Sequence, residues 1–270
     1  MGSTLSIVTV CLNDRTGLER TLRSVVAQSW KGWELVVVDG GSTDGSVDVV
    51  RQHGSHIRAW VSEPDGGVYE AQNKGVGLAS GDYCLFLNAG DHFVAEDVLE
   101  RAFAAAPDED VLYGDVVYSR HGFARRIRQA DRPSIFFLMR SILPTQATML
   151  RRELIERCGR HDTSLRIAAD YDLLMKAFLV HRATARHVPV ALSVHYQDGL
   201  SARPESRAVI ARERAIVQQR YLPPLVLELH QQYLALRERT LARRLRALFR
   251  PMARRARSLG RWLRGKPDEG

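Results

Sequence analysis

Polar side chains recur at a fixed interval in the first third of this 270-residue chain. Asn13, Asp39, Asp65 and Asp91 are each separated by 26 residues. Each follows an apolar segment that predicts a buried strand, and apolar residues at helical spacing fill the intervals. The strands are expected at 5–12, 33–38, 57–61 and 83–87, and the helices at 18–26, 46–52, 68–79 and 95–106. This alternation predicts an α/β fold with a mainly parallel sheet, helices on both faces, and the polar residues along the ligand-binding edge.

The second half of the chain is less regular. A hairpin is expected at 111–119 and 123–128, strands at 147–150 and 187–196, and a helix at 170–180. A long helix is expected from 206 to about 232, interrupted at Pro223–Pro224, because proline breaks the helical hydrogen-bond ladder. We therefore divide the chain into one domain at 1–205, with halves at 1–110 and 111–205, and C-terminal helices with a basic tail at 206–270.

The net charge of +8 belongs to the C-terminus. Residues 237–270 hold twelve Lys and Arg against three acids, whereas residues 1–236 hold 27 basic and 28 acidic groups. Such an asymmetry favours an anionic partner for the tail alone. In the tail, leucines at helical spacing alternate with arginines, which is typical of a helix that lies in a membrane interface. A solvated run of charges is the alternative.

Composition narrows the cellular setting. No run of about 18 apolar residues occurs, so we expect no membrane span. The first apolar segment lacks a basic leader and is typical of a strand rather than a signal peptide. Cys11, Cys84 and Cys158 have no metal-binding spacing, and two of them lie in expected strands. They are expected to be reduced core residues of a cytoplasmic protein.

Three motifs carry the chemistry. In VVVDGGSTDG (36–45), the carboxylate of Asp39 can accept a hydrogen bond from a base N–H, and the glycines allow a tight turn. SEPDGGVYEAQNKG (62–75) is a turn followed by a helix that carries Asn73 and Lys74. Each motif also has a purely structural interpretation. The first could be a plain turn in which Asp44 caps the next helix. The second could be a surface turn followed by a solvated lysine.

The third motif is LNAGD (87–91), in which a buried strand ends in the carboxylate of Asp91. Beside a nucleoside diphosphate such a carboxylate is repulsive unless a divalent cation lies between them. Mg²⁺ commonly binds one or two carboxylates together with phosphate oxygens. The alternative is an acid that caps the helix at 95–106, although Asp91 comes several residues too early for a cap.

Together these motifs resemble the family 2 glycosyltransferases, inverting enzymes of the GT-A fold that use nucleotide-diphospho-sugars. The resemblance covers about residues 5–201 and is strongest to bacterial members that build exopolysaccharides or glycolipids. It implies that residues 1–110 bind the donor and residues 111–205 the acceptor. The donor-binding residues that it implies are Val10, Asn13, Asp39, Asp65, Asn73, Lys74, Asn88 and Ala89.

The resemblance also implies the reactive groups. Asp91 is the last acid of the family's D-x-D region, which binds Mg²⁺ or Mn²⁺, and Asp170 in AADYDLLMK is the base on the acceptor side. His195 is a candidate metal ligand or phosphate contact, with a structural role as the alternative, and Gln146 is expected to face the acceptor. The chain departs from the pattern at Asn88 and Gly90, which replace the two acids of a D-x-D and leave Asp91 as the sole carboxylate of this region.

Residues around Asp170 allow a geometric prediction. Asp170 and Asp172 open the expected helix, and their side chains diverge by about 200° at 3.6 residues per turn. Only one of the two can face the cleft, and the resemblance selects Asp170. Both acids could instead serve only to cap the helix and to interact with its positive end.

We therefore expect an inverting hexosyltransferase that moves a sugar to a hydroxyl of a lipid-linked or glycan acceptor in cell-envelope polysaccharide or glycolipid synthesis. The tail, at residues 237–266, is expected to hold the enzyme peripherally on the inner face of the cell membrane. The alternative is a non-catalytic nucleotide- or nucleic-acid-binding protein whose arginine-rich tail contacts phosphates. The body lacks a basic surface interleaved with aromatic residues, so no nucleic acid is expected as a partner.

Overall fold

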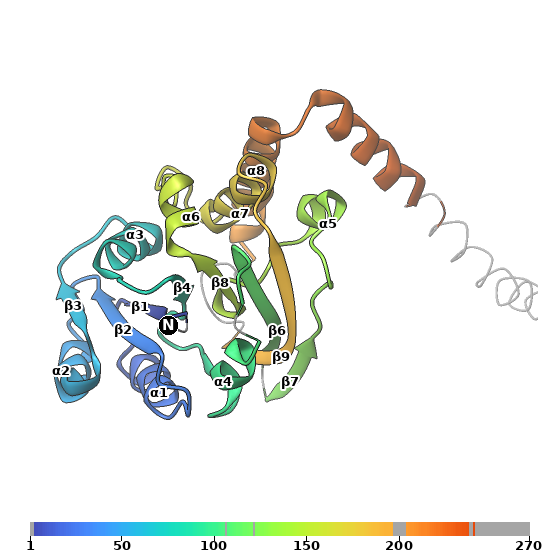
Figure 1. Ribbon diagram of the computed structural model, residues 1–270. Helices are drawn as coiled ribbons and strands as arrows, with labels where there is room; N and C mark the ends of the chain where they lie inside the picture. The colour runs from blue at the N-terminus through green and yellow to red at the C-terminus, as the bar shows by residue number, and fades with distance from the viewer. Residues whose placement is uncertain (1–2, 106, 121, 197–203, 238–239, 241–270) are drawn as a thin grey trace, which may run out of the picture. The chain divides into compact units, whose positions relative to one another are not determined.

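The computed structural model describes residues 3–105, 107–120, 122–196, 204–237 and 240 (Figure 1). Its strands are β1 (Leu5–Cys11), β2 (Trp33–Asp39), β3 (Ala59–Ser62), β4 (Tyr83–Phe86), β5 (His92–Phe93), β6 (Val111–Arg120), β7 (Phe123–Ile127), β8 (Thr148–Arg151) and β9 (Ala185–Tyr196). Its labelled helices are α1 (Arg15–Val26), α2 (Ser46–Gln52), α3 (Val68–Leu78), α4 (Val98–Phe103), α5 (Ile135–Arg140), α6 (Arg152–Arg157), α7 (Ala169–Leu179) and α8 (Ser206–Tyr221). Short 3₁₀ turns occur at Gly54–His56 and Thr145–Ala147.

The strands form a nine-stranded mixed sheet in the order β3-β2-β1-β4-β8-β6-β9-β5, with β7 paired to β6. β3, β2, β1 and β4 are parallel, as the 26-residue interval predicts. Beyond β4 in the sheet order, the sheet also contains antiparallel pairs. β8 is antiparallel to both β4 and β6, and β5 is antiparallel to β9. The predicted α/β class is therefore confirmed, and the sheet, predicted to be mainly parallel, is parallel from β3 to β4 and mixed beyond. The hairpin predicted after residue 111 is β6 and β7.

The apolar core lies on both faces of this sheet. Along β1, Leu5 and Ile7 belong to one buried cluster and Val8 and Val10 to the other, because successive side chains of a strand point to opposite faces. α1, α2 and α4 contribute to the first cluster, and α3, α6 and α7 to the second, which Figure 1 shows as helices on opposite sides of the strands. Burial on both faces explains why β1 and β2 are apolar without alternation.

Gly75 allows α3 to approach the sheet closely. A Cβ at this position would lie 2.3 Å from Cγ1 of Val8 on β1, which is far inside van der Waals contact. A side chain here would force α3 away from β1. Since the segment that precedes α3 carries Asp65, this close packing also fixes one wall of the binding edge.

Several elements differ from those predicted. The helix expected from residue 95 begins at Val98, because His92 and Phe93 are drawn into a two-residue strand against β9. α5 and α6 were not predicted from the sequence, and each has only six residues, too few for a clear period of 3.6. The three cysteines are free and buried, as expected. Among the described residues no helix is long and apolar enough to cross a membrane.

The chain divides into two compact units, Met1–Tyr221 and Leu222–Gly270. The first unit extends beyond residue 205, where the sequence analysis placed a boundary, since it includes α8. Helical conformation stops at residues 222–223 and resumes at 224–237, so the interruption predicted at Pro223–Pro224 occurs. The leucine and arginine pattern of 241–270 lies outside the described residues.

Candidate active site

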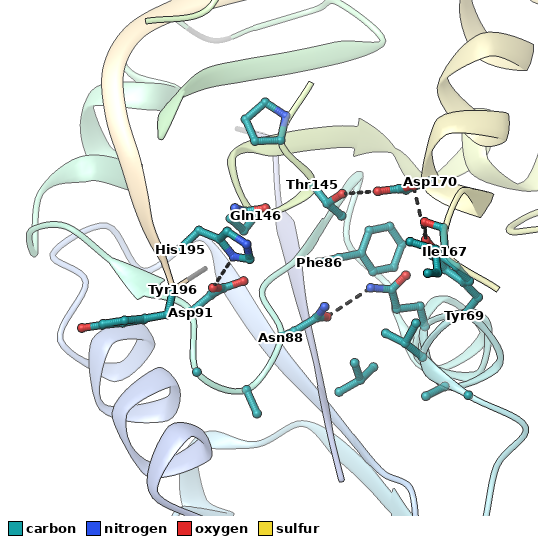
Figure 2. A pocket seen from close by; sticks show the side chains of 18 of the residues that line it. Tyr69, Phe86, Asn88, Asp91, Thr145, Gln146, Ile167, Asp170, His195 and Tyr196 are labelled. Carbon is teal, nitrogen blue, oxygen red and sulfur yellow. Dashed lines mark hydrogen bonds and ion pairs between the residues drawn. The ribbon is translucent and has the colours of Figure 1, made fainter. Parts of the chain in front are cut away.

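A pocket of about 970 Å³ lies beyond the carboxyl ends of β1 and β4 (Figure 2). Its walls come from distant parts of the first unit: the end of β1, the start of α3, the loop 88–91, the segment 142–146, the start of α7, the end of β9 and α8. Of the predicted site residues, the pocket is lined by Val10, Asp65, Asn88, Ala89, Asp91, Gln146, Asp170 and His195. The structure thus brings residues from both halves of the domain to one site.

Asp39 presents an unused acceptor at the end of β2. Its Oδ2 accepts hydrogen bonds from the backbone N–H groups of Gly41 and Ser42, at 3.2 and 2.9 Å, and from the hydroxyl of Ser62 at 2.7 Å. Its Oδ1 is buried and has no hydrogen-bond partner among the described residues. A buried carboxylate oxygen without a partner is costly unless a ligand supplies a donor. The atom is therefore suited to accept from an N–H group of a bound base.

Asp65 lies beside that turn. A Cβ added to Gly40 would be 2.8 Å from Oδ2 of Asp65, so the segments that follow β2 and β3 approach closely there. Asp65 also accepts a hydrogen bond from the N–H of Gly67 at 2.8 Å and lines the pocket. The two acids that the sequence placed 26 residues apart therefore lie near one another, as predicted for neighbouring parallel strands.

Besides Asp39, three predicted donor-binding residues do not line the pocket, and each of them has internal partners. Asn13, at φ 51°, accepts a hydrogen bond from the N–H of Thr43 at 2.8 Å and so holds the turn after β2. The amide of Asn73 both donates to the carbonyl and accepts from the N–H of His161, each at 2.9 Å. The ammonium group of Lys74 pairs with Glu63 at 3.0 Å and with Glu70 at 3.1 Å. Their roles as ligands remain predictions.

The loop 88–91 is held by α1. The hydroxyl of Thr21 donates to the carbonyl of Asp91 at 2.6 Å and accepts from the N–H of Gly90 at 3.1 Å. Gly90 has φ +98°, a left-handed conformation that favours glycine and that allows this turn after β4. The side chain of Asn88 accepts from the amide of Gln72 at 3.1 Å.

Asp91 and His195 meet at one end of the pocket. Oδ1 of Asp91 lies 2.8 Å from Nδ1 of His195, although 104 residues separate them in the chain. The short pairing of β5 with β9, which sets His92 opposite Val194, brings them together. Among the described residues no group of three or more His, Cys, Asp or Glu side chains forms a metal site. One carboxylate and one imidazole do fit a divalent cation that takes its other ligands from a diphosphate.

Two further residues at this end were not predicted. The guanidinium carbon of Arg20 lies 4.3 Å from the ring centroid of Tyr196, and both side chains line the pocket. A Cβ on Gly90 would be 3.9 Å from Nη2 of Arg20, so this cation lies beside the loop that ends in Asp91. The sequence pattern of α1 does not distinguish Arg20 from the nearby Arg23. The structure does, because only Arg20 of the two lines the pocket.

Asp170 is at the other end of the pocket, as Figure 2 shows, with Phe86 between it and the Asp91–His195 pair. Its Oδ2 accepts from the hydroxyl of Thr145 at 3.0 Å, and its Oδ1 accepts from the N–H of Tyr171 at 2.7 Å and from the hydroxyl of Tyr69 at 3.3 Å. Burial raises the pKa of Asp170, and these hydrogen bonds oppose that increase only in part. A carboxylate with a raised pKa is a stronger proton acceptor.

Asp172 faces away from the pocket, as the helical geometry predicts. Its Oδ1 accepts hydrogen bonds from Arg220 and from the hydroxyl of Tyr221, both at 3.1 Å and both on α8. Of the two acids that open α7, only Asp170 lines the pocket. Thr145 and Tyr69, which bind Asp170, were not predicted as site residues. Tyr69 could have been, because it lies within the second motif.

Comparisons with known proteins agree with this geometry. The sequence profile described as "Glycosyl transferase family 2" matches residues 6–168. An uncharacterized glycosyltransferase of Mycobacterium tuberculosis is 36% identical over 183 residues, which are 66% of this chain and 70% of the relative. A PGL/p-HBAD biosynthesis glycosyltransferase of Mycobacterium bovis is 32% identical over 200 residues, 72% of this chain and 77% of the relative.

Two solved structures are similar in fold. S. aureus TarS 1-349 in complex with UDP-GlcNAc has a TM-score of 0.65 at 20% identity, and the match covers 82% of this chain and 68% of the 1-349 chain. The mannosyltransferase PcManGT from Pyrobaculum calidifontis, in complex with GDP-Man and Mn²⁺, has a TM-score of 0.57 at 22% identity, covering 80% of this chain and 61% of the neighbour. At these identities the likeness shows a common GT-A-type fold.

Proposed function

The chain belongs to glycosyl transferase family 2 and is a glycosyltransferase, and we propose that it transfers a sugar with inversion from a nucleoside-diphospho-sugar to a hydroxyl of a lipid-linked or glycan acceptor. One observation carries the proposal. The pocket holds Asp91 beside His195 at one end and Asp170, with a raised pKa, at the other. Direct displacement requires this separation, because the base and the departing group act on opposite faces of the anomeric carbon.

On the acceptor side, Asp170 receives the proton of the attacking hydroxyl. The oxygen of the acceptor forms a bond to the anomeric carbon while the bond from that carbon to the diphosphate oxygen breaks. Thr145 and Tyr69 hold the carboxyl of Asp170 from two directions, so that it faces the pocket in a fixed orientation. A base within hydrogen-bond reach contributes about 10²- to 10⁴-fold to such a step.

On the donor side, Asp91 and His195 would hold Mg²⁺ or Mn²⁺. When bound, this cation neutralises charge on the departing diphosphate. The carboxylate and imidazole are in place for this role, and a fold neighbour was solved with Mn²⁺ and GDP-Man. The guanidinium of Arg20, beside Gly90, supplies a fixed positive charge at the same end.

The base of the donor would be bound at Asp39. The buried Oδ1 of Asp39 has no partner among the described residues and matches a ring N–H, which uracil and guanine both carry. TarS was solved with UDP-GlcNAc and PcManGT with GDP-Man, so both bases occur among the fold neighbours. These observations favour a donor whose base carries such an N–H.

The acceptor belongs to the cell envelope in this proposal. Relatives are named for PGL/p-HBAD biosynthesis and, at 31% identity over 118 residues, for teichuronic acid biosynthesis in Bacillus subtilis. The arginine-rich residues 237–266 would bind anionic lipid on the cytoplasmic face of the membrane, where a lipid-linked acceptor is accessible. Each cation near such a surface contributes about 1 kcal/mol.

A panel of nucleoside-diphospho-sugars tests the proposal. Donors that bind the native state raise the melting temperature by mass action, and Mg²⁺ or Mn²⁺ is expected to enlarge this shift. The same donors are then assayed for release of nucleoside diphosphate with and without acceptor. Release from one donor supports the proposal, whereas nucleic-acid affinity without turnover of any donor would favour the non-catalytic alternative.

A further inference from the structure

The helix that carries Asp170 has no capping side chain at its N-cap position. Its N-cap residue is Ala168, whose side chain makes no capping hydrogen bond. The N-terminal N–H groups of a helix have no partner within it and usually bond to a Ser, Thr, Asp or Asn side chain at the N-cap. Substituting such a cap by alanine costs about 1 kcal/mol. The N–H of Tyr171 is bound by Oδ1 of Asp170, whereas the N–H of the N-cap residue Ala168 takes its acceptor from another element.

Glu213 of α8 supplies this acceptor. Its Oε1 accepts from the N–H of Arg166 at 2.8 Å, and its Oε2 accepts from the N–H groups of Ile167 and Ala168 at 2.9 and 3.0 Å. Three successive N–H groups at the entrance to α7 thus point at one carboxylate. Bonds to an ionised acceptor are about twice as strong as neutral ones, and a carboxylate is also favoured near the positive end of a helix.

This segment is directly connected to Asp170. The carbonyl of Ile167, the middle of the three residues, accepts a hydrogen bond from the hydroxyl of Tyr69, and the same hydroxyl contacts Oδ1 of Asp170. Only Ala168 and Ala169 separate Ile167 from Asp170 in the chain. A rotation of these peptides would therefore move Tyr69 and the carboxyl of Asp170 together.

α8 is held against α7 by other contacts, so the position of Glu213 is itself fixed. The guanidinium carbon of Arg214 lies 4.2 Å from the ring centroid of Tyr171, and Nε2 of Gln218 donates to the hydroxyl of that tyrosine at 3.0 Å. Two residues further along α8, Arg220 bonds to Asp172 at 3.1 Å. Replacing Glu213 alone leaves these contacts in place, so the variant removes its three bonds to residues 166–168 without releasing α8.

We propose that Glu213 is a positioning residue for Asp170, because its carboxylate on α8 binds the N–H groups of residues 166–168 at the entrance to α7 and thereby fixes the direction in which the Asp170 carboxyl faces the pocket. The proposal rests on the proposed function, in which Asp170 is the base. Glu213 does not line the pocket itself. Its loss is therefore expected to affect the transfer step and not the binding of the donor.

The test compares Glu213→Ala and Glu213→Gln with Glu205→Ala, which removes an exposed acid just before α8. UDP-N-acetylglucosamine and GDP-mannose serve as donors and octyl glucoside as a hydroxyl-bearing acceptor. For Glu213→Ala we expect kcat to fall about 10- to 10²-fold, the scale of a small misplacement of a reacting group. KM for the donor and the dissociation constant of the nucleoside diphosphate are expected to stay within about twofold of the wild-type values. Glu213→Gln keeps one acceptor oxygen and is expected to recover part of the loss, and Glu205→Ala to behave as wild type.

The possible results separate this proposal from the proposed function. Equal losses in kcat and in nucleoside diphosphate affinity would indicate general destabilisation and would overturn it. A wild-type kcat in Glu213→Ala would also overturn it while leaving the proposed function intact. A wild-type chain that releases nucleoside diphosphate from no donor would contradict the proposed function, and the positioning role with it.

Discussion

Exchanging the two acids of α7 for asparagine, one at a time, separates catalysis from stability. Asp170→Asn removes a proton acceptor that faces the pocket and keeps the size of the side chain and one of its two acceptor oxygens. Asp172→Asn removes a charge that faces Arg220 and Tyr221 on α8. We expect Asp170→Asn to bind the donor normally and to lose transfer, and Asp172→Asn to keep transfer and lose stability.

The size of each effect follows from the contacts. Loss of a general base costs about 10²- to 10⁴-fold in rate, or about 3 to 5 kcal/mol in the activation barrier. For Asp172→Asn the amide oxygen can still accept a hydrogen bond, and Arg220 keeps its ion pair with Asp162 at 2.7 Å. We therefore expect a loss of about 1 to 2 kcal/mol in the free energy of unfolding, the scale of one charge-assisted hydrogen bond.

The raised pKa of Asp170 predicts the direction in which Asp170→Asn changes the stability of the fold. Burial raises this pKa above its value in the unfolded chain, so the folded state binds the proton more tightly. The stability that Asp170 contributes is complete below the unfolded pKa and is lost as the pH rises through the folded pKa. At neutral pH the ionised group therefore opposes folding. Asp170→Asn removes that cost, and its melting temperature at pH 7 is expected to equal or exceed that of the wild type.

Three measurements on both variants test this reasoning: transfer rate, donor-induced thermal shift, and melting temperature without ligand. The expected pattern is an inactive Asp170→Asn with a normal donor shift, and an active Asp172→Asn with a lower melting temperature. Wild-type transfer in Asp170→Asn together with an inactive Asp172→Asn would show that the roles of the two acids are reversed. If both variants transfer normally, neither acid is the base.

Three other predictions concern the rest of the site and the tail. Asp91→Ala is expected to lose metal-stimulated turnover while the melting temperature without ligand is retained, and full activity of both wild type and variant in chelator would refute metal use. Asp39→Asn replaces an acceptor pair by an amide that offers a donor, so we expect about tenfold weaker nucleoside diphosphate binding, the scale of one hydrogen bond to a charged group; unchanged affinity would exclude Asp39 from base recognition. A chain that ends at Gln232 is expected to sediment less with anionic liposomes than the full chain, and equal sedimentation of the two would rule out the tail as the membrane contact.

The sequence predicted the first half of the sheet because its strands pair in a regular way. Each of β1, β2 and β3 leads through a helix to the next strand, and the four strands β1 to β4 pair in parallel, so a single interval describes them all. The second half lacks such an interval. β6 pairs in parallel with β9, more than 60 residues later, while β8 inserts antiparallel between β4 and β6. No periodic pattern in the sequence specifies that order.

The candidate site shows the same division. Asp39, Asp65 and Asp91 were predictable because each follows a recognisable strand, and Asp170 came from resemblance to a family. The contact of His195 with Asp91 depends on β5, which has only two residues and too little pattern to be predicted. The proposed role of Glu213 depends on where α8 packs, which its own sequence does not indicate.

The stereochemistry of the product tests the central claim most directly. With an α-linked nucleoside-diphospho-sugar as donor, the anomeric configuration of the transferred sugar can be read by NMR in the first turnovers, before the product is altered. A single displacement assisted by Asp170 predicts a β-linked product. An α-linked product would contradict the account, because it requires retention and therefore a different use of the two ends of the pocket.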